Sequence, residues 1–283
     1  MEHDPRLFES AWLKWAWAKA HAETLKAYLQ VWGNDPKRWT RIGMATRYDP
    51  KHHRFNVYVM ELPSLPIEWS VVIGDIGHNY RSCLDHIAWA IVRRGTKPPD
   101  TLSEYDQSRV GFPIYDDRIK FNRGVKTMLP GARRADIAIV RRNQPYHGGK
   151  RRSGRHAFAV LHRLSNEDKH RTIQPTFMSP QAATYHVENA LGCTVTRIPA
   201  SFLLGEPLQV GAQLAPIYVR KTGPTEPYLE MRGQLAVQPA ILGVLLGEWL
   251  VAMEDLVSTI LKELADPPTD LLAKLGGPVV PGA

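Results

Sequence analysis

The chain has 283 residues, of which 43% are hydrophobic and 23% charged, a composition typical of a folded globular protein and not of a disordered or fibrous one. Cys83 and Cys193 are its only cysteines, which excludes a disulfide scaffold or a cysteine-rich zinc site and favours a reducing compartment. The longest apolar run is broken by Glu248 and is too short to span a bilayer, and the N-terminus lacks an apolar signal core. We therefore expect a cytoplasmic protein without a membrane partner.

The net charge of +8 is concentrated in one part of the chain. Of the 36 Lys and Arg residues, 14 lie between 95 and 155, against 6 of the 28 Asp and Glu residues, so the rest of the chain holds 22 of each sign. A concentrated basic surface attracts polyanions, chiefly nucleic acid, because binding releases counterions. The alternative is a solvated surface that only keeps the protein in solution.

The first half of the chain predicts helices interrupted by one hairpin. Apolar residues recur at helical spacing behind Asp4-Pro5 and predict an amphipathic helix over 5–32. Two alternating segments within 40–62, separated by a turn at Asp49-Pro50, predict a β-hairpin. Further helices, the last one preceded by a Gly-rich basic loop, are expected over 66–94, 116–128, 132–142 and 155–171.

The second half changes to the alternating pattern of antiparallel strands over 172–238. A strongly amphipathic helix is expected over 240–265, followed by a flexible tail over 266–283. Helices and strands do not alternate as in βαβ units, which argues against a doubly wound parallel sheet. The sequence therefore predicts an α+β protein, a single domain over 1–265 in which a bundle of four or more helices packs with an antiparallel β-layer.

The helix expected over 66–94 carries a polar island inside an apolar segment, GHNYRSCLDHIAW at 77–89. At 100° per residue with Arg81 as origin, Asp85 lies at about 40°, His78 at about 60°, His86 at about 140° and Asn79 at about 160°. Apolar residues cover the rest of the helix, so we expect a buried helix whose polar side chains are paired internally or line a cleft.

The helix expected over 155–171 offers a partner for this polar arc. Its apolar stripe of Ala157, Leu161 and Leu164 continues into Asp168, which places a carboxylate on the core-facing line. We expect Asp168 to face Arg81 across a helix pair, because a planar guanidinium can bind two acceptors at once.

Three interpretations of this cluster stay open. The first is a structural polar network that fixes the register of the helices. The second is metal-independent RNA cleavage, in which Arg81 holds the phosphate and His86, in R-x4-H spacing, exchanges a proton with the ribose 2′-hydroxyl. The third is a divalent-metal site, in which ligands for zinc or a similar ion are drawn from His78, Asp85, His147 and His170.

Four motifs in order, GDIGHNYRSCLDHIAW, FPIY, QPYH and LHRLSNEDKH, resemble the pattern of a widespread group of uncharacterised bacterial proteins. The resemblance covers about residues 55–172. It implies that the polar residues of these motifs belong to one site: Asn79, Arg81, Asp85, His86, His147, Asn166, Asp168, Lys169 and His170.

The R-x4-H helix is also similar to HEPN domains, which are helical, often dimeric and frequently ribonucleases. That likeness implies a homodimer in which Arg81 and His86 of two protomers form a composite site. We therefore expect a HEPN-like protein that binds or cleaves RNA in a stress or defence setting and needs no cofactor or metal. The alternatives are a non-enzymatic interaction module and a metal-binding hydrolase.

The expected roles divide the candidate residues into three groups. The catalytic group consists of Arg81, His86, Asp85, Asp168, His170 and His147. The nucleic-acid-binding group lies in the Gly-rich basic loop and consists of Lys150, Arg151, Arg152 and Arg155. The supporting group consists of His78, Asn79, Asn166 and Lys169.

Overall fold

The computed structural model describes the chain in seven stretches: residues 6–34, 43–95, 101–168, 175–178, 184–198, 207–234 and 238–268. Within them, the side chains of 150, 151, 168, 184–186, 207, 232–234 and 238 are not described. The fold is α+β, with helices and antiparallel sheets, as the sequence predicts. The chain divides into two compact units, unit 1 with residues 1–26, 68–173 and 248–283 and unit 2 with residues 27–67 and 174–247. The single domain over 1–265 stays a prediction.

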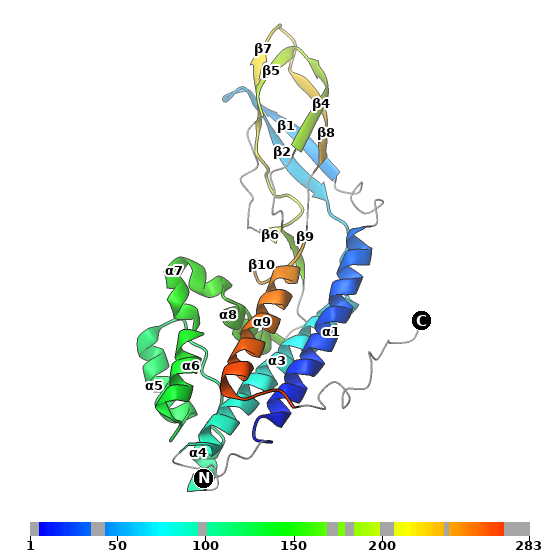
Figure 1. The fold of residues 1–283 in the computed structure, drawn as a ribbon. Coiled ribbons are helices and arrows are strands. Elements are labelled where there is room, and N and C mark those ends of the chain that lie inside the picture. The colour runs from blue at the N-terminus through cyan, green and yellow to red at the C-terminus, as the bar shows by residue number, and fades with distance from the viewer. Residues whose placement is uncertain are drawn as a thin grey trace. The chain divides into compact units, whose positions relative to one another are not determined.

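Unit 1 is a bundle of helices (Figure 1). Its long helices are α3 (Glu68–Arg93), α8 (Ala157–Asp168), α9 (Leu246–Leu264) and the first part of α1 (Glu9–Gly33). Its shorter helices are α4 (Glu104–Gln107), α5 (Arg118–Met128), α6 (Arg134–Arg142) and α7 (Gly149–Arg152), with 3-10 turns η2 (Pro145–Gly148) and η3 (Ser153–Arg155).

Helix α3 is held by neighbours that are distant in the sequence. The Cys83 thiol donates to the carbonyl of Ala11 on α1 at 3.2 Å. A Cβ atom added at Gly77 would lie 2.5 Å from Leu164 Cδ2, so the absence of a side chain lets α8 approach α3 closely. The two helices that the sequence pairs therefore pack together.

Arg94, directly after the C-terminal end of α3, connects that end to two other helices. Arg94 donates from Nε and Nη2 to the Asp136 carboxylate on α6, at 3.3 and 2.6 Å. Its Nη1 donates to the carbonyl of Leu264 on α9 at 2.9 Å. Because the two side chains are only 10% and 6% exposed, the guanidinium and carboxylate satisfy each other away from water.

The described residues of unit 2 form three antiparallel sheets. The first has the order β1-β2-β7-β5 and is formed by Gly43–Asp49, Arg54–Glu61, Ile217–Lys221 and Cys193–Arg197. The second has the order β10-β9-β3-β6 and is formed by Val244–Leu245, Gln238–Ile241, Thr176–Met178 and Pro207–Leu208. The third pairs β4 (Thr184–Leu191) with β8 (Tyr228–Gln234).

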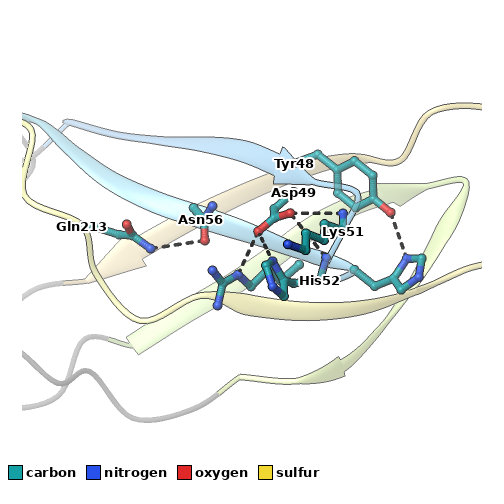
Figure 2. Close-up of polar contacts among 8 residues, drawn as sticks. Tyr48, Asp49, Lys51, His52, Asn56 and Gln213 are labelled. Carbon is teal, nitrogen blue, oxygen red and sulfur yellow. Dashed lines mark hydrogen bonds and ion pairs between the residues drawn. The ribbon is translucent and has the colours of Figure 1, made fainter.

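The β1–β2 hairpin turns where the sequence predicts. The Asp49 carboxylate accepts hydrogen bonds from the backbone N–H groups of Lys51 and His52, at 3.1 and 3.3 Å, which closes the turn locally. His53 has a φ of 48° and completes the reversal. Figure 2 shows Asp49, Lys51 and His52 gathered at this turn.

Two segments differ from the sequence-based expectation. The last helix begins at Leu246, not at 240, because residues 238–245 form the β9–β10 hairpin. Its two turn residues, Leu242 and Gly243, have φ of 48° and 79°, as tight hairpin turns require. The basic stretch expected as a loop instead folds into η2, α7 and η3. The ends of the helices expected over 5–32 and 155–171 lie partly outside the described residues.

In the described part of the chain, no helix is long and apolar enough to cross a membrane.

Candidate functional site

The centre of the candidate site is an ion pair within one turn of α3. Arg81 donates from Nε to Asp85 Oδ2 at 3.0 Å and from Nη2 to Asp85 Oδ1 at 2.8 Å. The two residues are four positions apart and lie on the same side of the helix. Both oxygens of the carboxylate are engaged, which is the strongest geometry that an arginine and a carboxylate can form. The side chains are 21% and 38% exposed, so this pair reaches solvent.

Asp85 also anchors a separate segment of chain. Its Oδ1 accepts a hydrogen bond from the backbone N–H of Phe112 at 2.9 Å. A Cβ atom at the preceding Gly111 would lie 3.3 Å from Asp85 Oδ1 and 3.7 Å from Arg81 Nη2. Glycine therefore allows the backbone of the GFPIY segment to lie against the ion pair.

The other side of the same segment is held by Gln144, the first residue of the QPYH motif. Its Oε1 accepts from the backbone N–H of Tyr115 at 3.0 Å, and its Nε2 donates to the carbonyl of Pro113 at 2.9 Å. Gln144 is 1% exposed, so these bonds satisfy an amide that burial would otherwise penalise. Three of the four motifs thus meet at residues 111–115.

His86 lies on α3 about 140° around the helix from Arg81. Its side chain is half-buried. Burial lowers the pKa of His86, the positive charge of Lys14 on α1 lowers it further, and Asp85 opposes both effects. The imidazole is therefore neutral near pH 7 and can accept a proton. Within a single chain, Arg81 and His86 point in different directions.

The polar arc of α3 is partly exposed, which corrects the expectation of a helix buried all round. His78 is exposed, and Val71 and Trp89 on the same stripe are 65% and 37% exposed. Asn79 is buried, but its amide donates to the carbonyl of Asp75 in the same helix, at 2.9 Å. Val71, His78 and Trp89 therefore form an exposed stripe along α3.

The residues expected from the fourth motif are only partly described. Asn166 on α8 is exposed, and its amide lies 3.3 Å from His162 Nε2. Asp168 is the last residue of α8, and its side chain lies outside the described residues, as do Lys169 and His170 entirely. The pairing of Arg81 with Asp168 stays a prediction, while the structure pairs Arg81 with Asp85.

His147 lies on the 3-10 turn η2 and contacts residues close to it in the sequence. It is exposed, its ring centroid lies 4.4 Å from that of Tyr146, and its Nε2 lies 3.0 Å from the carbonyl oxygen of Arg141. Among the described residues, no hydrogen bond or ion pair joins His147 to Arg81, Asp85 or His86. The QPYH motif therefore reaches Asp85 on α3 through Gln144 and the 111–115 segment. The sequence did not single out Gln144, because a neutral amide carries no signal of acid–base chemistry.

The basic stretch presents its charges on the surface of unit 1. Arg152 and Arg155 are exposed, whereas the side chains of Lys150 and Arg151 are not described. Helices α5 and α6, with the residue before α6, add exposed cations: Arg118, Lys120, Arg123, Lys126, Arg133, Arg134, Arg141 and Arg142. Of the acidic residues nearby, Asp136 is buried against Arg94. The charge excess seen in the sequence is therefore a surface excess.

Among the described residues, no group of three or more His, Cys, Asp or Glu side chains could hold a metal ion. His78 and Asp85 lie on α3 and His147 on η2, while His170 is outside the described part. Comparison of the chain with protein-family models, with curated proteins and with solved structures found no match.

Proposed function

We propose that the protein binds RNA and cleaves it without a metal, as a HEPN-like homodimer. The observation that carries the proposal is the presence of a solvent-reaching arginine and a half-buried histidine on one helix. Burial lowers the pKa of this histidine, which favours the neutral form near pH 7. Arg81 and His86 diverge by about 140°, so one phosphodiester would meet Arg81 of one protomer and His86 of the other. The open stripe of α3, with exposed Val71 and Trp89, supports such a contact between copies.

The proposed reaction is transfer of the phosphodiester to the neighbouring 2′-oxygen. His86 takes the proton of the 2′-hydroxyl, and the oxygen attacks the adjacent phosphorus. The bond from phosphorus to the 5′-oxygen breaks, and the leaving oxygen takes a proton from water. The products are a 2′,3′-cyclic phosphate and a 5′-hydroxyl, and Arg81 stabilises the charge that builds on the phosphate oxygens.

The ion pair with Asp85 is compatible with this role. Asp85 engages Nε and Nη2 of Arg81, and Nη1 makes no hydrogen bond to any described residue. A guanidinium held at two nitrogens by a carboxylate is fixed in orientation, and its remaining donors can bind a phosphate oxygen. The exposed cations of α5, α6 and residues 152–155 would attract the RNA to unit 1.

The test is cleavage of end-labelled single-stranded RNA in EDTA by wild type, Arg81→Lys, His86→Gln and the control His21→Gln. Removing a general base lowers the rate by roughly 100-fold or more, and we expect a similar loss for Arg81→Lys because a lysine does not reproduce the planar fork. His21→Gln changes a histidine on α1 and should retain full activity. Mixing Arg81→Lys with His86→Gln should restore part of the activity if the site is shared between protomers.

Equal cleavage by all four proteins, with intact folding by circular dichroism, would rule out the proposed nuclease. Loss of activity in EDTA with recovery in zinc or manganese would favour a metal-dependent hydrolase. A chromatogram with a single monomeric species at micromolar concentration would contradict the composite site.

A second candidate is a non-enzymatic interaction module in which the α3 cluster is structural. The hydrogen bond from Phe112 to Asp85 favours it, because Asp85 links α3 to the 111–115 segment whether or not a substrate binds. In that case Arg81→Lys lowers the stability of the protein and the RNA-cleaving activity is absent from wild type.

A further inference from the structure

The β1-β2-β7-β5 sheet of unit 2 has two different faces. Buried and exposed residues alternate along β2, where Phe55, Val57 and Val59 are buried and the residues between them are half-exposed. The same alternation occurs in β7, with Ile217 and Val219 buried. Side chains at paired positions of neighbouring strands lie on the same face, so the register assigns every residue to the inner or the outer face.

The inner face is covered by the β4–β8 pair. The hydroxyl of Thr46 on β1 donates to the carbonyl of Leu229 on β8 at 3.5 Å. The thiol of Cys193 on β5 lies 3.8 Å from the carbonyl oxygen of Tyr228. Burial raises the pKa of the Cys193 thiol. The inner face is therefore the packed core of this unit.

The outer face carries arginines, tyrosines and amides. By register and alternation its polar members are Arg47, Asp49, Arg54, Asn56, Tyr58, Thr194, Arg197, Gln213, Tyr218 and Arg220, and the small Ala45 lies opposite Tyr58. All of them are half-exposed or exposed. Four are cations, and the one anion is Asp49, whose carboxylate is already bound by His52 at 2.7 Å and by Arg54 at 3.3 Å.

One row of this face runs across the whole sheet. Asp49 pairs with Arg54, Arg54 with Tyr218 and Tyr218 with Arg197. The Arg197 guanidinium carbon lies 5.7 Å from the centre of the Tyr218 ring, a cation–π contact that keeps the ring in place. A tyrosine is thus flanked by an arginine on each neighbouring strand.

A second aromatic position lies along β2. Tyr58 is four residues from Arg54, a distance of roughly 13 Å along a strand, and pairs with Gln213 on the adjoining segment. Gln213 donates from Nε2 to Asn56 Oδ1 at 3.2 Å, and Figure 2 shows these two amides side by side on the sheet. Between the two tyrosines the face therefore presents the amides of Asn56 and Gln213.

We propose that this outer face binds single-stranded RNA, with bases stacking on Tyr58 and Tyr218 and the phosphates bound by Arg47, Arg54, Arg197 and Arg220. Proteins that bind single strands combine aromatic platforms with a cationic track, because every base has a flat face and every phosphate a negative charge. The choice of RNA over single-stranded DNA rests on the proposed function; binding at the sheet does not require cleavage on α3.

The chemistry of the face distinguishes a single strand from other polyanions. A duplex offers phosphates but no free base faces to the tyrosines. An anionic membrane is bound through basic residues together with inserted apolar side chains. Phe55, Val57 and Ile217 are buried on the inner face, and Met60 near the end of β2 is the large apolar residue of this sheet that is exposed among those described, at 55%.

The test uses the full-length chain and fluorescence anisotropy with a labelled mixed-sequence 20-nucleotide RNA, the same sequence as DNA, and an RNA duplex. The sheet variant is Tyr218→Leu/Arg197→Gln, which removes one aromatic ring and one positive charge from the outer face. The control variant is Tyr28→Leu/Arg93→Gln, which removes the same residue types from exposed positions on α1 and α3. Each protein is also assayed for RNA cleavage and for binding to vesicles of anionic phospholipid.

We expect single-strand binding at least roughly tenfold weaker in the sheet variant, because each base–aromatic stack contributes strongly to affinity. Its salt dependence should also decrease, because fewer counterions are released. The control variant should bind as wild type. A further variant, Tyr58→Leu, should weaken single-strand binding without changing the salt dependence.

Wild-type affinity in the sheet variant would overturn the inference, as would equal loss in the control variant, duplex binding as tight as single-strand binding, or binding to vesicles alone. If wild type cleaves RNA, His86→Gln does not, and the sheet variants bind RNA as wild type does, the proposed function stands and the inference about the sheet is wrong. If RNA binding depends on the sheet and wild type does not cleave RNA, the inference stands and the proposed nuclease function is wrong.

Discussion

Arg81 and Asp85 form a bidentate ion pair within one turn of α3, and Asp85 extends it to the backbone of Phe112. The same carboxylate therefore orients a guanidinium and fixes the GFPIY segment. Catalytic and structural roles of this pair can be separated, because only the structural role acts through Phe112.

Asp85→Ala should lower the free energy of unfolding by about 1–3 kcal/mol, because the Phe112 N–H and the guanidinium lose their acceptor. Asp75→Ala, at an exposed position of the same helix, should change it by less than about 0.5 kcal/mol. Urea unfolding measures both. Equal effects of the two substitutions would contradict an anchoring role for Asp85.

Gly77→Ala should destabilise the bundle by about 1–3 kcal/mol, because the new methyl group would lie 2.5 Å from Leu164 Cδ2 in a closely packed interior. This cost exceeds the gain in helix propensity of up to about 1 kcal/mol. Gly247→Ala, in α9 with open space around its Cβ position, is the matched control and should be neutral or slightly stabilising. Thermal unfolding of both variants shows whether each substitution raises or lowers the stability of the protein.

The Arg94–Asp136 pair should be far more sensitive than the exposed Arg142–Glu263 pair. Asp136→Ala leaves a guanidinium buried without its carboxylate, a change that costs about 3–5 kcal/mol. Glu263→Ala removes a partner from an arginine that is 56% exposed, which should cost less than about 1 kcal/mol. Similar losses in chemical denaturation would show that the buried pair is not needed to hold α3, α6 and α9.

The stability of the protein should fall on acidification through pH 6.5. Burial, with a smaller effect of His147, lowers the pKa of His156 below its ordinary value of 6.5, so the unfolded chain binds the proton more readily. The contribution of neutral His156 to the free energy of unfolding is therefore complete above about pH 6.5, and it decreases as the pH falls toward the pKa of His156 in the folded state. His156 Nδ1 also accepts from the Phe158 N–H at 3.2 Å, and protonation removes that acceptor from the start of α8.

His156→Asn keeps an acceptor at this position and should flatten the dependence of stability on pH between about 5 and 7. His156→Ala should lose about 1 kcal/mol at pH 8 because the cap is gone. Urea midpoints measured at several pH values test both variants. An unchanged slope in His156→Asn would exclude this histidine as the source.

If His86 is the general base, cleavage should persist below pH 6.5. Burial, reinforced by Lys14, lowers the pKa of His86, so the imidazole remains neutral at pH values where an exposed histidine is protonated. Lys14→Gln should move the acidic limb of the pH–rate profile toward higher pH. No movement would mean that Lys14 does not influence the catalytic proton acceptor.

The periodicity of apolar residues in the sequence was sufficient to predict most helices and strands, because each of these elements buries one side of a repeating pattern. It predicted α3 and α8, the β1–β2 hairpin and the later strands. It misplaced the start of α9, because the apolar run AILGV at 240–244 is compatible with the first turn of a helix and with the β9–β10 hairpin. The turn at Leu242–Gly243 gives only a weak local signal in the sequence. That the four motifs form one functional site stays a prediction; the structure joins three of them through Asp85, the 111–115 segment and Gln144.

The contacts between different motifs were decided by the tertiary structure. The sequence pattern suggested that Arg81 pairs with a carboxylate on another helix, whereas in the structure it pairs with Asp85, one turn away on α3. Asp85 Oδ1 also accepts the backbone N–H of Phe112, a contact between distant segments. The exposed side of α3 depends on which neighbours pack around it, and pattern along one helix does not specify them. The outer face of the sheet likewise required strand register, because Arg54, Tyr218 and Arg197 come together only when three distant strands pair.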